Sequence, residues 1–316
     1  MVFAYAILGL VILLLAGDAL VKGAVNLSLR IGIPALIVSL TIVAFGTSAP
    51  ELLISIKAAL DGVPGIALGN VVGSNTANVL LVLGIPAMIA VMHTAECDTR
   101  KSFVQMIGAT VLFVALAFRG VFDRFAALIL LLVLAGFLWM AVRDALAHRR
   151  AGDLEEDLEE PEGADPDMPW WKIIIYLLLG LIGLPYGASL LVDSAREIAL
   201  MYGVSDTVIG LTLVAIGTSL PELATTVMAA LRRQADVALG NVIGSNLFNL
   251  LAIIGIAALI KPMPVDPAFL SFDLWVMLAA SLLLIPFVYL GKNLTRLWGI
   301  VLTALYLAYL TAVLAF

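Results

Sequence analysis

The stretch of sequence that decides the fold runs from Ala44 to Ile89 and reads AFGTSAPELLISIKAALDGVPGIALGNVVGSNTANVLLVLGIPAMI. A second stretch runs from Ala215 to Ile260, reads AIGTSLPELATTVMAALRRQADVALGNVIGSNLFNLLAIIGIAALI, and aligns with the first at a constant offset of 171 without a gap. The two are identical at 24 of 46 positions. Shared hydrophobicity would match Leu with Ile, but it would not align GTSxPEL, ALGNV and GSN together. The chain therefore contains an internal duplication.

The composition around both copies is typical of a polytopic membrane protein. Of the 316 residues, 63% are hydrophobic and 13% are charged, whereas soluble domains have about 45–50% and about 25%. The apolar segments are continuous rather than alternating, which favours membrane helices over membrane β-strands. We expect an all-α polytopic membrane protein with ten transmembrane helices, near residues 2–24, 33–60, 64–92, 102–119, 124–146, 171–199, 205–231, 236–260, 269–290 and 294–315. This composition excludes soluble globular and disordered chains, and a single cysteine excludes a disulfide scaffold.

The spacing of the two copies predicts inverted repeats. Five expected spans separate them, an odd number, so the second copy enters the membrane from the opposite side. Inverted halves are a transporter architecture, with the substrate site near the membrane midplane at the interface between repeats. We expect a first five-helix repeat over 1–146, with its motif at 44–89, and a second over 171–316, with its motif at 215–260. Residues 147–170 form the linker.

The charge distribution predicts an orientation in the membrane. The net charge of −6 is concentrated in the linker, because residues 151–169 hold nine acidic residues and no Lys or Arg. A loop-by-loop count places 12 of the 17 Lys and Arg residues on one side of the membrane. The positive-inside rule makes that side the cytoplasm. We therefore expect a multi-pass protein of the cell (inner) membrane that has both termini on the outer side of this membrane and the acidic linker in the cytoplasm.

Each copy carries a Gly-Thr-Ser-x-Pro-Glu motif inside an apolar span. Proline removes a backbone N–H group, so carbonyls around residues 44–47 and 215–218 are expected to lose regular helical partners. Such carbonyls are tolerated in a membrane only where protein, water or an ion satisfies them. The acids Glu51 and Glu222 follow the prolines, and a charge at the bilayer centre costs roughly 2.5–3.5 kcal/mol. The symmetric pair predicts a cation site, against the alternative of a packing role for each glutamate.

A second motif, Gly-Asn-x-x-Gly-Ser-Asn-x-x-Asn, also occurs twice. Its serine and last asparagine lie four residues apart and share one helix face. We expect these four residues to offer oxygen ligands: Ser74, Asn78, Ser245 and Asn249. The remaining asparagines could instead hydrogen-bond between closely packed helices, and both roles stay open for them: Asn70, Asn75, Asn241 and Asn246.

The predicted site contains oxygen atoms only. Two carboxylates, amide oxygens and carbonyls join the hydroxyls of Thr47, Ser48, Thr218 and Ser219, and no Cys or His belongs to the set. Oxygen ligands suit hard cations such as Ca²⁺. Two glutamates neutralise one Ca²⁺ ion, or they could hold Na⁺ ions or protons instead. Because these cations exclude one another from one small site, the site favours exchange.

The sequences GTSAPE with GNVVGSNxxN, and GTSLPE with GNVIGSNxxN, resemble the two α-repeats of the cation/calcium exchanger superfamily, in particular its bacterial and archaeal sodium/calcium exchangers. The resemblance implies Na⁺/Ca²⁺ antiport by alternating access, in which the first and sixth helices slide against the others. It implies that Glu51 and Glu222 ligate both ions and that Thr47 and Thr218 offer backbone carbonyls. It further implies Na⁺ sites completed by the carbonyls of Ala44 and Ala215 with Ser48, Ser74, Ser219 and Ser245, and a centre lined by Asn78.

One position bears on the coupling ion. Potassium-dependent members of the superfamily carry an aspartate where this chain has Asn249, so the resemblance disfavours K⁺ co-transport. The main competing function is a cation/H⁺ exchanger for Ca²⁺ or another divalent cation, although the GNxxE pattern of the proton-coupled branch is absent. Two further classes of protein compete with a transporter: a channel or membrane scaffold, and an intramembrane enzyme. We expect no enzyme activity, no cofactor and no nucleic-acid partner; the substrates are Ca²⁺ and Na⁺, the surroundings are the lipid bilayer, and the oligomeric state is left open.

Overall fold

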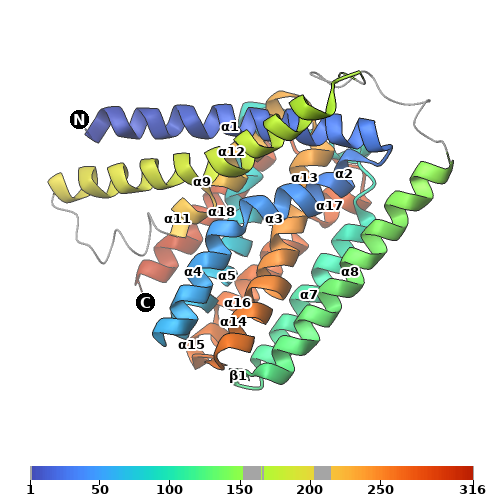
Figure 1. Cartoon of the computed structure of the whole chain (residues 1–316). Helices are drawn as coiled ribbons and strands as arrows, with labels where there is room; N and C mark the ends of the chain where they lie inside the picture. The colour runs from blue at the N-terminus through green and yellow to red at the C-terminus, as the bar shows by residue number, and fades with distance from the viewer. Residues whose placement is uncertain (1, 152–164, 166, 203–214, 316) are drawn as a thin grey trace.

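The apolar segments form helices, as the sequence predicts. The computed structural model describes residues 2–151, 165, 167–202 and 215–315 (Figure 1). Most of the acidic linker and part of the expected span 205–231 therefore lie outside the described residues. The first repeat contains α1 (Val2–Ile31), α2 (Ala35–Val38), η1 (Ser39–Val43), α3 (Ala44–Thr47), α4 (Ala49–Asp61), α5 (Pro64–Ala77), η2 (Asn78–Val82), α6 (Gly84–Ile89), η3 (Thr94–Glu96), α7 (Arg100–Ala117) and α8 (Arg124–Ala151). The second contains α9 (Trp170–Met201), α11 (Ala215–Thr218), α12 (Leu220–Leu231), α13 (Ala235–Leu247), η5 (Phe248–Ile253), α14 (Ile254–Ile260), α15 (Pro267–Ser271), α16 (Asp273–Leu282), α17 (Ile285–Tyr289) and α18 (Arg296–Ala315).

Eight helices in the described part of the chain are long and apolar enough to cross a membrane. A ninth crossing is the pair 35–47 and 49–61, which bends by 46°. The expected tenth, near 205–231, is represented by α11 and α12 among the described residues. These elements confirm the nearly all-helical polytopic fold.

The helices that carry the asparagine motifs occupy the centre of the protein. In the most apolar 18-residue stretch of each segment, 78% of the residues are buried inside the protein for 64–89 and 83% for 235–260. The same share is 17% for α8 and for α18. Two motif-bearing helices thus lie inside the protein, while α8 and α18 present apolar surface to the lipid. A polar group on α5 or α13 must therefore be satisfied by the protein or by a ligand.

Two short backbone pairings reveal the inversion. The strand β1 (Val121–Phe122) pairs antiparallel with β2 (Met263–Pro264), and Met92 pairs with Leu294. Met92 and Met263 stand at the repeat offset of 171. Met92 comes just before α7 in the chain, whereas Met263 pairs with Phe122, which comes just after α7. These two equivalent residues therefore lie at opposite ends of this spanning helix.

The first helices of the two repeats pack closely through glycine. Figure 1 shows α1 and α9 side by side, running across the other helices. A Cβ atom built on Gly9 would lie 2.8 Å from the backbone nitrogen of Leu191, and one on Gly180 would lie 2.4 Å from Leu20 Cβ. Small residues allow such close approach in membranes, where the hydrophobic effect gives helices no reason to associate.

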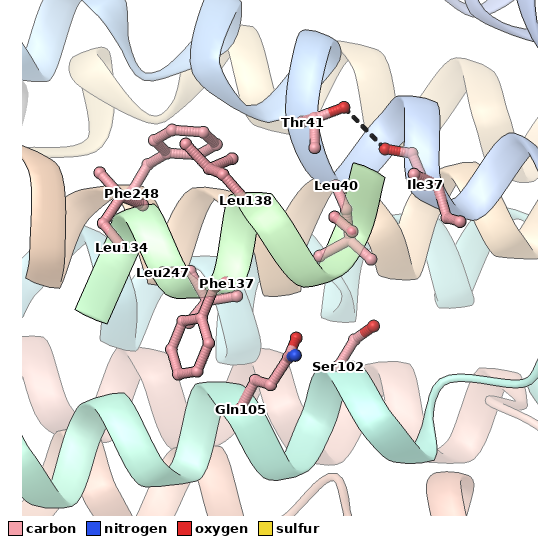
Figure 2. A pocket seen from close by; sticks show the side chains of 11 residues that line it. Ile37, Leu40, Thr41, Ser102, Gln105, Leu134, Phe137, Leu138, Leu247 and Phe248 are labelled. Atoms are coloured by element: carbon pink, nitrogen blue, oxygen red, sulfur yellow. Dashed lines mark hydrogen bonds between the residues drawn. The ribbon is translucent and has the colours of Figure 1, made fainter. Parts of the chain in front are cut away.

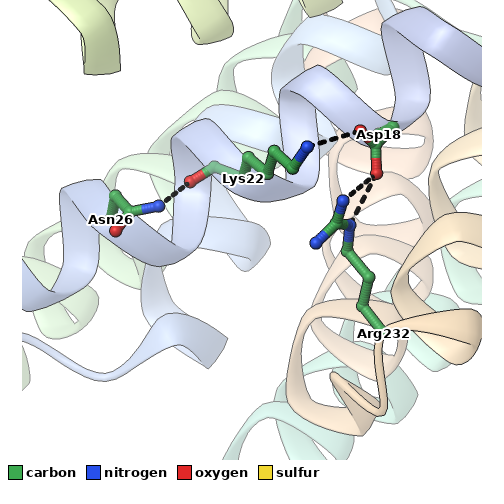
Figure 3. A network of polar contacts seen from close by, with 4 residues as sticks. All are labelled: Asp18, Lys22, Asn26 and Arg232. Atoms are coloured by element: carbon green, nitrogen blue, oxygen red, sulfur yellow. Dashed lines mark hydrogen bonds and ion pairs between the residues drawn. The ribbon is translucent and has the colours of Figure 1, made fainter. Parts of the chain in front are cut away.

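A charged cluster joins α1 to the end of α12 (Figure 3). The Asp18 carboxylate accepts a hydrogen bond from Arg232 Nε at 2.6 Å and forms an ion pair with Lys22 Nζ at 3.0 Å. The Asp18 and Arg232 side chains are 21% and 16% exposed. One carboxylate is therefore shared by two partly buried cations.

This arrangement predicts unequal effects of two neutral substitutions. Asp18→Asn leaves Lys22 and Arg232 close together without their shared counter-ion, whereas Arg232→Gln leaves the Asp18–Lys22 pair intact. We expect Asp18→Asn to lower the melting temperature of the purified protein more, by an amount corresponding to about 1 kcal/mol. Thermal unfolding of both variants in detergent, at low and high salt, measures the difference. Equal destabilisation would show that the shared carboxylate does not hold the cluster.

Candidate ion-binding site

The proline motifs break the helix at the same point in each repeat. In the first, α3 ends at Thr47 and α4 begins at Ala49, and Ser48 between them has φ −83° and ψ 5°. Ser219 occupies the equivalent break with φ −89° and ψ 6°. Each glutamate consequently lies in the first turn of the following helix, where the helix dipole favours negative charge.

The backbone near the break differs in one respect from the expectation. The Ala44 carbonyl accepts the Ser48 N–H at 3.1 Å and the Thr47 hydroxyl at 3.3 Å. The prediction that the proline frees this carbonyl is wrong, because the N–H that Pro50 lacks would have bonded to Gly46, and the Ser48 N–H still bonds to Ala44. Ala215 lies in α11, and its side chain is outside the described set.

Short π-helical segments carry the last asparagine of each motif. Asn78 begins η2, and Asn249 is the second residue of η5. A π-helical segment widens one turn and is frequent at functional sites. The sequence motif identifies both asparagines but contains no signal for this local geometry.

Glu222 is bound by residues of both repeats. Its Oε1 accepts hydrogen bonds from Ser48 Oγ at 3.1 Å and from Ser245 Oγ at 3.4 Å. Glu222 is fully buried and Glu51 is 1% exposed. The two carboxylates are close enough to interact electrostatically. The structure thus brings Ser48 of the first repeat and Ser245 of the second to the same glutamate.

The second residue of each asparagine motif donates a hydrogen bond to the backbone carbonyl of a glutamate. Asn70 Nδ2 donates to the Glu51 carbonyl at 3.2 Å and to Ser55 Oγ at 3.1 Å. Its Oδ1 accepts from the Thr218 hydroxyl at 3.4 Å. Of the two roles that the sequence leaves open for this asparagine, the structure therefore favours hydrogen bonding between helices.

Asn241 repeats the same pattern in the second half. Its Nδ2 donates to the Glu222 carbonyl at 3.3 Å and to Thr226 Oγ1 at 3.2 Å. The Thr47 hydroxyl donates to Asn241 Oδ1 at 3.2 Å. Both motif threonines therefore use their hydroxyls to connect the repeats.

The described residues include a set of buried side-chain oxygens that have no hydrogen-bond partner in the protein. Seven of the nine unpartnered buried polar atoms belong to predicted ligand residues: Glu51 Oε1 and Oε2, Ser74 Oγ, Asn78 Oδ1, Ser219 Oγ, Glu222 Oε2 and Asn249 Oδ1. Buried polar atoms are almost always hydrogen-bonded, and an unpaired one costs free energy. Seven oxygens from two repeats, with two carboxylates among them, match the ligands of a hard cation.

Cavities lie at related places in the two repeats. One, of about 380 Å³, is lined by Ser74, Asp273 and Tyr309, and the Tyr309 hydroxyl donates to Asp273 Oδ1 at 3.0 Å. The other, of about 60 Å³, has Ser102 and Leu138 at the positions equivalent to Asp273 and Tyr309 (Figure 2). Figure 2 shows it surrounded mainly by apolar side chains of α2, η1, α8, α13 and η5, above α7. Of these two cavities, only the larger one is lined by a predicted ligand residue, Ser74. The larger cavity therefore leads toward the unpartnered oxygens, which we call the oxygen cluster.

Inverted helical repeats with buried acidic oxygens at their interface define the class of secondary ion transporters. The family model described as sodium/calcium exchanger protein matches residues 1–143 and 172–315, and the chain belongs to this family. This match confirms the resemblance that the motifs indicate.

Individual relatives cover nearly the whole chain. It is 38% identical over 310 residues to the putative antiporter CaxA of Alkalimonas amylolytica, with 96% of each protein covered. It is 33% identical to the sodium/calcium exchanger MaX1 of Methanosarcina acetivorans, covering 98% of this chain and 97% of the relative. A structure of the sodium-calcium exchanger NCX_Mj superposes with a TM-score of 0.82 at 31% identity, covering 98% of this chain and 97% of that one. The chain is therefore a multi-pass membrane cation/Ca²⁺ antiporter and not an enzyme.

Proposed function

We propose that the protein exchanges Na⁺ for Ca²⁺ across the membrane by alternating access, without K⁺. The observation that carries the proposal is the set of seven unpartnered buried oxygens, which includes a carboxylate from each inverted repeat. Two carboxylates balance the charge of one Ca²⁺ ion, and neutral oxygens can complete its coordination.

Ligand roles follow from the free oxygens. Glu51, with both oxygens unpartnered, and Glu222 Oε2 are the anionic ligands of Ca²⁺. Asn78 and Asn249 supply amide oxygens to the same centre. We assign the Na⁺ positions around it to the hydroxyls of Ser48, Ser74, Ser219 and Ser245 and to the carbonyls of Ala215, Thr47 and Thr218. The Ala44 carbonyl is left out, because it already accepts the Ser48 N–H and the Thr47 hydroxyl.

The same oxygens explain why transport would be an exchange. A divalent cation and several monovalent cations cannot share one small site of low dielectric constant, because their mutual repulsion is poorly screened there. Leaving the carboxylates without any cation is also costly inside a membrane. Each passage across the membrane then requires one kind of cation or the other.

The names of two relatives support Na⁺ as the coupling ion. MaX1 is named as a sodium/calcium exchanger, and NCX_Mj was studied after soaking with Na⁺ and Ca²⁺. Potassium-dependent members of the superfamily resembled by this chain carry an aspartate at the position of Asn249. This chain has a neutral amide there instead, which supports transport without K⁺. Proton coupling is the competing mechanism and is separated by experiment below.

We place both termini outside the cell (inner) membrane and the linker over 147–170 in the cytoplasm, joining repeats over 1–146 and 171–316. The Lys and Arg distribution supports this orientation. The opposite positions of the two β pairings support the inverted relation of the halves.

Flux in proteoliposomes tests the function. Vesicles loaded with Na⁺ and diluted into Na⁺-free medium are expected to accumulate radiolabelled Ca²⁺, because outward Na⁺ flow supplies the free energy. An imposed K⁺ gradient at clamped membrane potential should leave the rate unchanged. Uptake driven by a pH gradient alone, with no response to Na⁺, would replace the proposal with cation/H⁺ exchange. Protein-free vesicles provide the control.

A further inference from the structure

Four buried asparagines form two hydrogen-bonded pairs between the repeats. Asn249 Nδ2 donates to Asn75 Oδ1 at 3.1 Å, and Asn78 Nδ2 donates to Asn246 Oδ1 at 3.1 Å. All four side chains are at most 1% exposed. In each pair, the proposed ligand residue donates its amide nitrogen to the other repeat, and its own oxygen is one of the unpartnered atoms of the site.

A methionine lies behind each supporting asparagine. Asn75 Nδ2 lies 3.8 Å from Met277 Sδ, and Asn246 Nδ2 lies 3.7 Å from Met106 Sδ. A thioether sulfur carries no hydrogen and can only accept. It therefore pairs with the amide NH₂ group and not with the amide oxygen.

The backbone reinforces this orientation at Asn75. Its Nδ2 also donates to the Asn246 carbonyl at 3.4 Å, which is a second acceptor on the same side. With the NH₂ group of Asn75 held between two acceptors, its oxygen faces Asn249 and must receive a donor. Asn249 can supply that donor only by directing its own NH₂ group away from the site.

We propose that Asn75 and Asn246 are positioning residues, which fix the amide orientation of Asn249 and Asn78 so that each presents its oxygen to the cation. The inference rests on the proposed function, since it assumes that a cation occupies the oxygen cluster. Rotating either ligand amide by half a turn would place two N–H donors where an oxygen is needed. A donor group there would repel the ion instead of binding it.

The arrangement occurs twice, which gives an internal replicate. The repeat offset of 171 relates Asn75 to Asn246 and also Met106 to Met277. Each asparagine is oriented by the methionine of the opposite repeat. A chance contact would not recur with the same donors and acceptors at both places.

A double-mutant cycle tests the orientation. Asn75→Leu removes the acceptor of Asn249, while Asn249→Asp puts a carboxylate at the ligand position, which presents an oxygen in either orientation. In the protein with the unmodified Asn249, we expect Asn75→Leu to weaken Ca²⁺ binding by roughly 10-fold, because about one buried hydrogen bond is lost. Beside Asn249→Asp the same change should cause no loss of affinity, since no amide remains to be oriented and a carboxylate cannot donate to Asn75 Oδ1.

The measurements separate this role from a merely structural one. Ca²⁺-dependent thermal stabilisation of the purified protein gives the affinity, and the melting temperature without Ca²⁺ reports folding. The mirror cycle, Asn246→Leu with Asn78→Asp, repeats the test in the other half. Asn75→Ser, which is smaller but keeps an acceptor, should retain more affinity than Asn75→Leu and serves if the leucine variant does not fold.

The outcomes distinguish the two proposals. Equal losses of affinity in the Asn249 and Asn249→Asp backgrounds would overturn the positioning role while leaving the exchange function in place. If the unmodified protein showed no Ca²⁺-dependent stabilisation and no Na⁺-driven uptake, both proposals would fail together. A Met277→Leu variant, which keeps the volume and removes the acceptor, should weaken binding in the same direction as Asn75→Leu but less.

Discussion

Glu51→Gln and Glu222→Gln are each expected to abolish Na⁺-driven Ca²⁺ uptake while the protein remains inserted in the membrane. Glutamine matches glutamate in shape but replaces an anionic oxygen by a neutral amide. Two unit charges 4 Å apart attract each other by about 4 kcal/mol at an effective dielectric constant of 20, and a divalent cation doubles this attraction. The lower cost of burying a neutral amide offsets roughly half of the loss. The expected loss of affinity is therefore on the order of 100- to 1,000-fold, which takes Ca²⁺ binding out of the working range.

Folding should survive both substitutions. The unpartnered Glu51 oxygens and Glu222 Oε2 form no protein hydrogen bond that the change could break, and a neutral amide is less costly to bury than a charge. Glu197→Gln, on an exposed position of α9, makes the same chemical change away from the site and serves as the matched control. Flux retained in both site variants would remove the two glutamates from the proposed site.

The parts of the site that could be predicted from sequence are those that occur twice in an apolar context. Glu51 and Glu222 stand out because an acid in a membrane span is costly, and its recurrence at the same motif position makes chance a poor explanation. The break at Ser48 follows from Pro50 by local stereochemistry. Both inferences need only neighbouring residues and the period of the repeat.

The contacts that the sequence could not reveal depend on the tertiary structure. The pairing of Asn249 with Asn75 joins residues 174 positions apart, and the pairing of Arg232 with Asp18 joins residues 214 positions apart. Which way an amide faces is decided by such partners, here by a methionine sulfur that looks from the sequence like ordinary apolar packing. For the same reason, the freed carbonyl expected at Ala44 proved to be occupied by the Ser48 N–H.

Two helical glycines of the described residues have opposite surroundings. A Cβ atom built on Gly244 of α13 would lie 2.5 Å from the Leu40 carbonyl oxygen and 2.6 Å from Ala44 Cβ. At Gly108, an exposed position of α7, no atom of the described residues would lie within 4 Å. These two glycines thus give a pair of positions for the same substitution, one crowded and one open.

Gly244→Ala is expected to destabilise the protein strongly, whereas Gly108→Ala should leave its stability close to that of the unmodified chain. The added methyl group on Gly244 meets backbone, which cannot turn aside as a flexible side chain would, so η1 must move off α13. Overpacking of this kind costs about 1–3 kcal/mol. Because the displaced segment leads directly into Thr47 and Ser48, Gly244→Ala should also lose Ca²⁺-dependent stabilisation. Melting temperatures in detergent, with and without Ca²⁺, measure both effects, and equal melting temperatures for the two variants would contradict the close packing of η1 on α13.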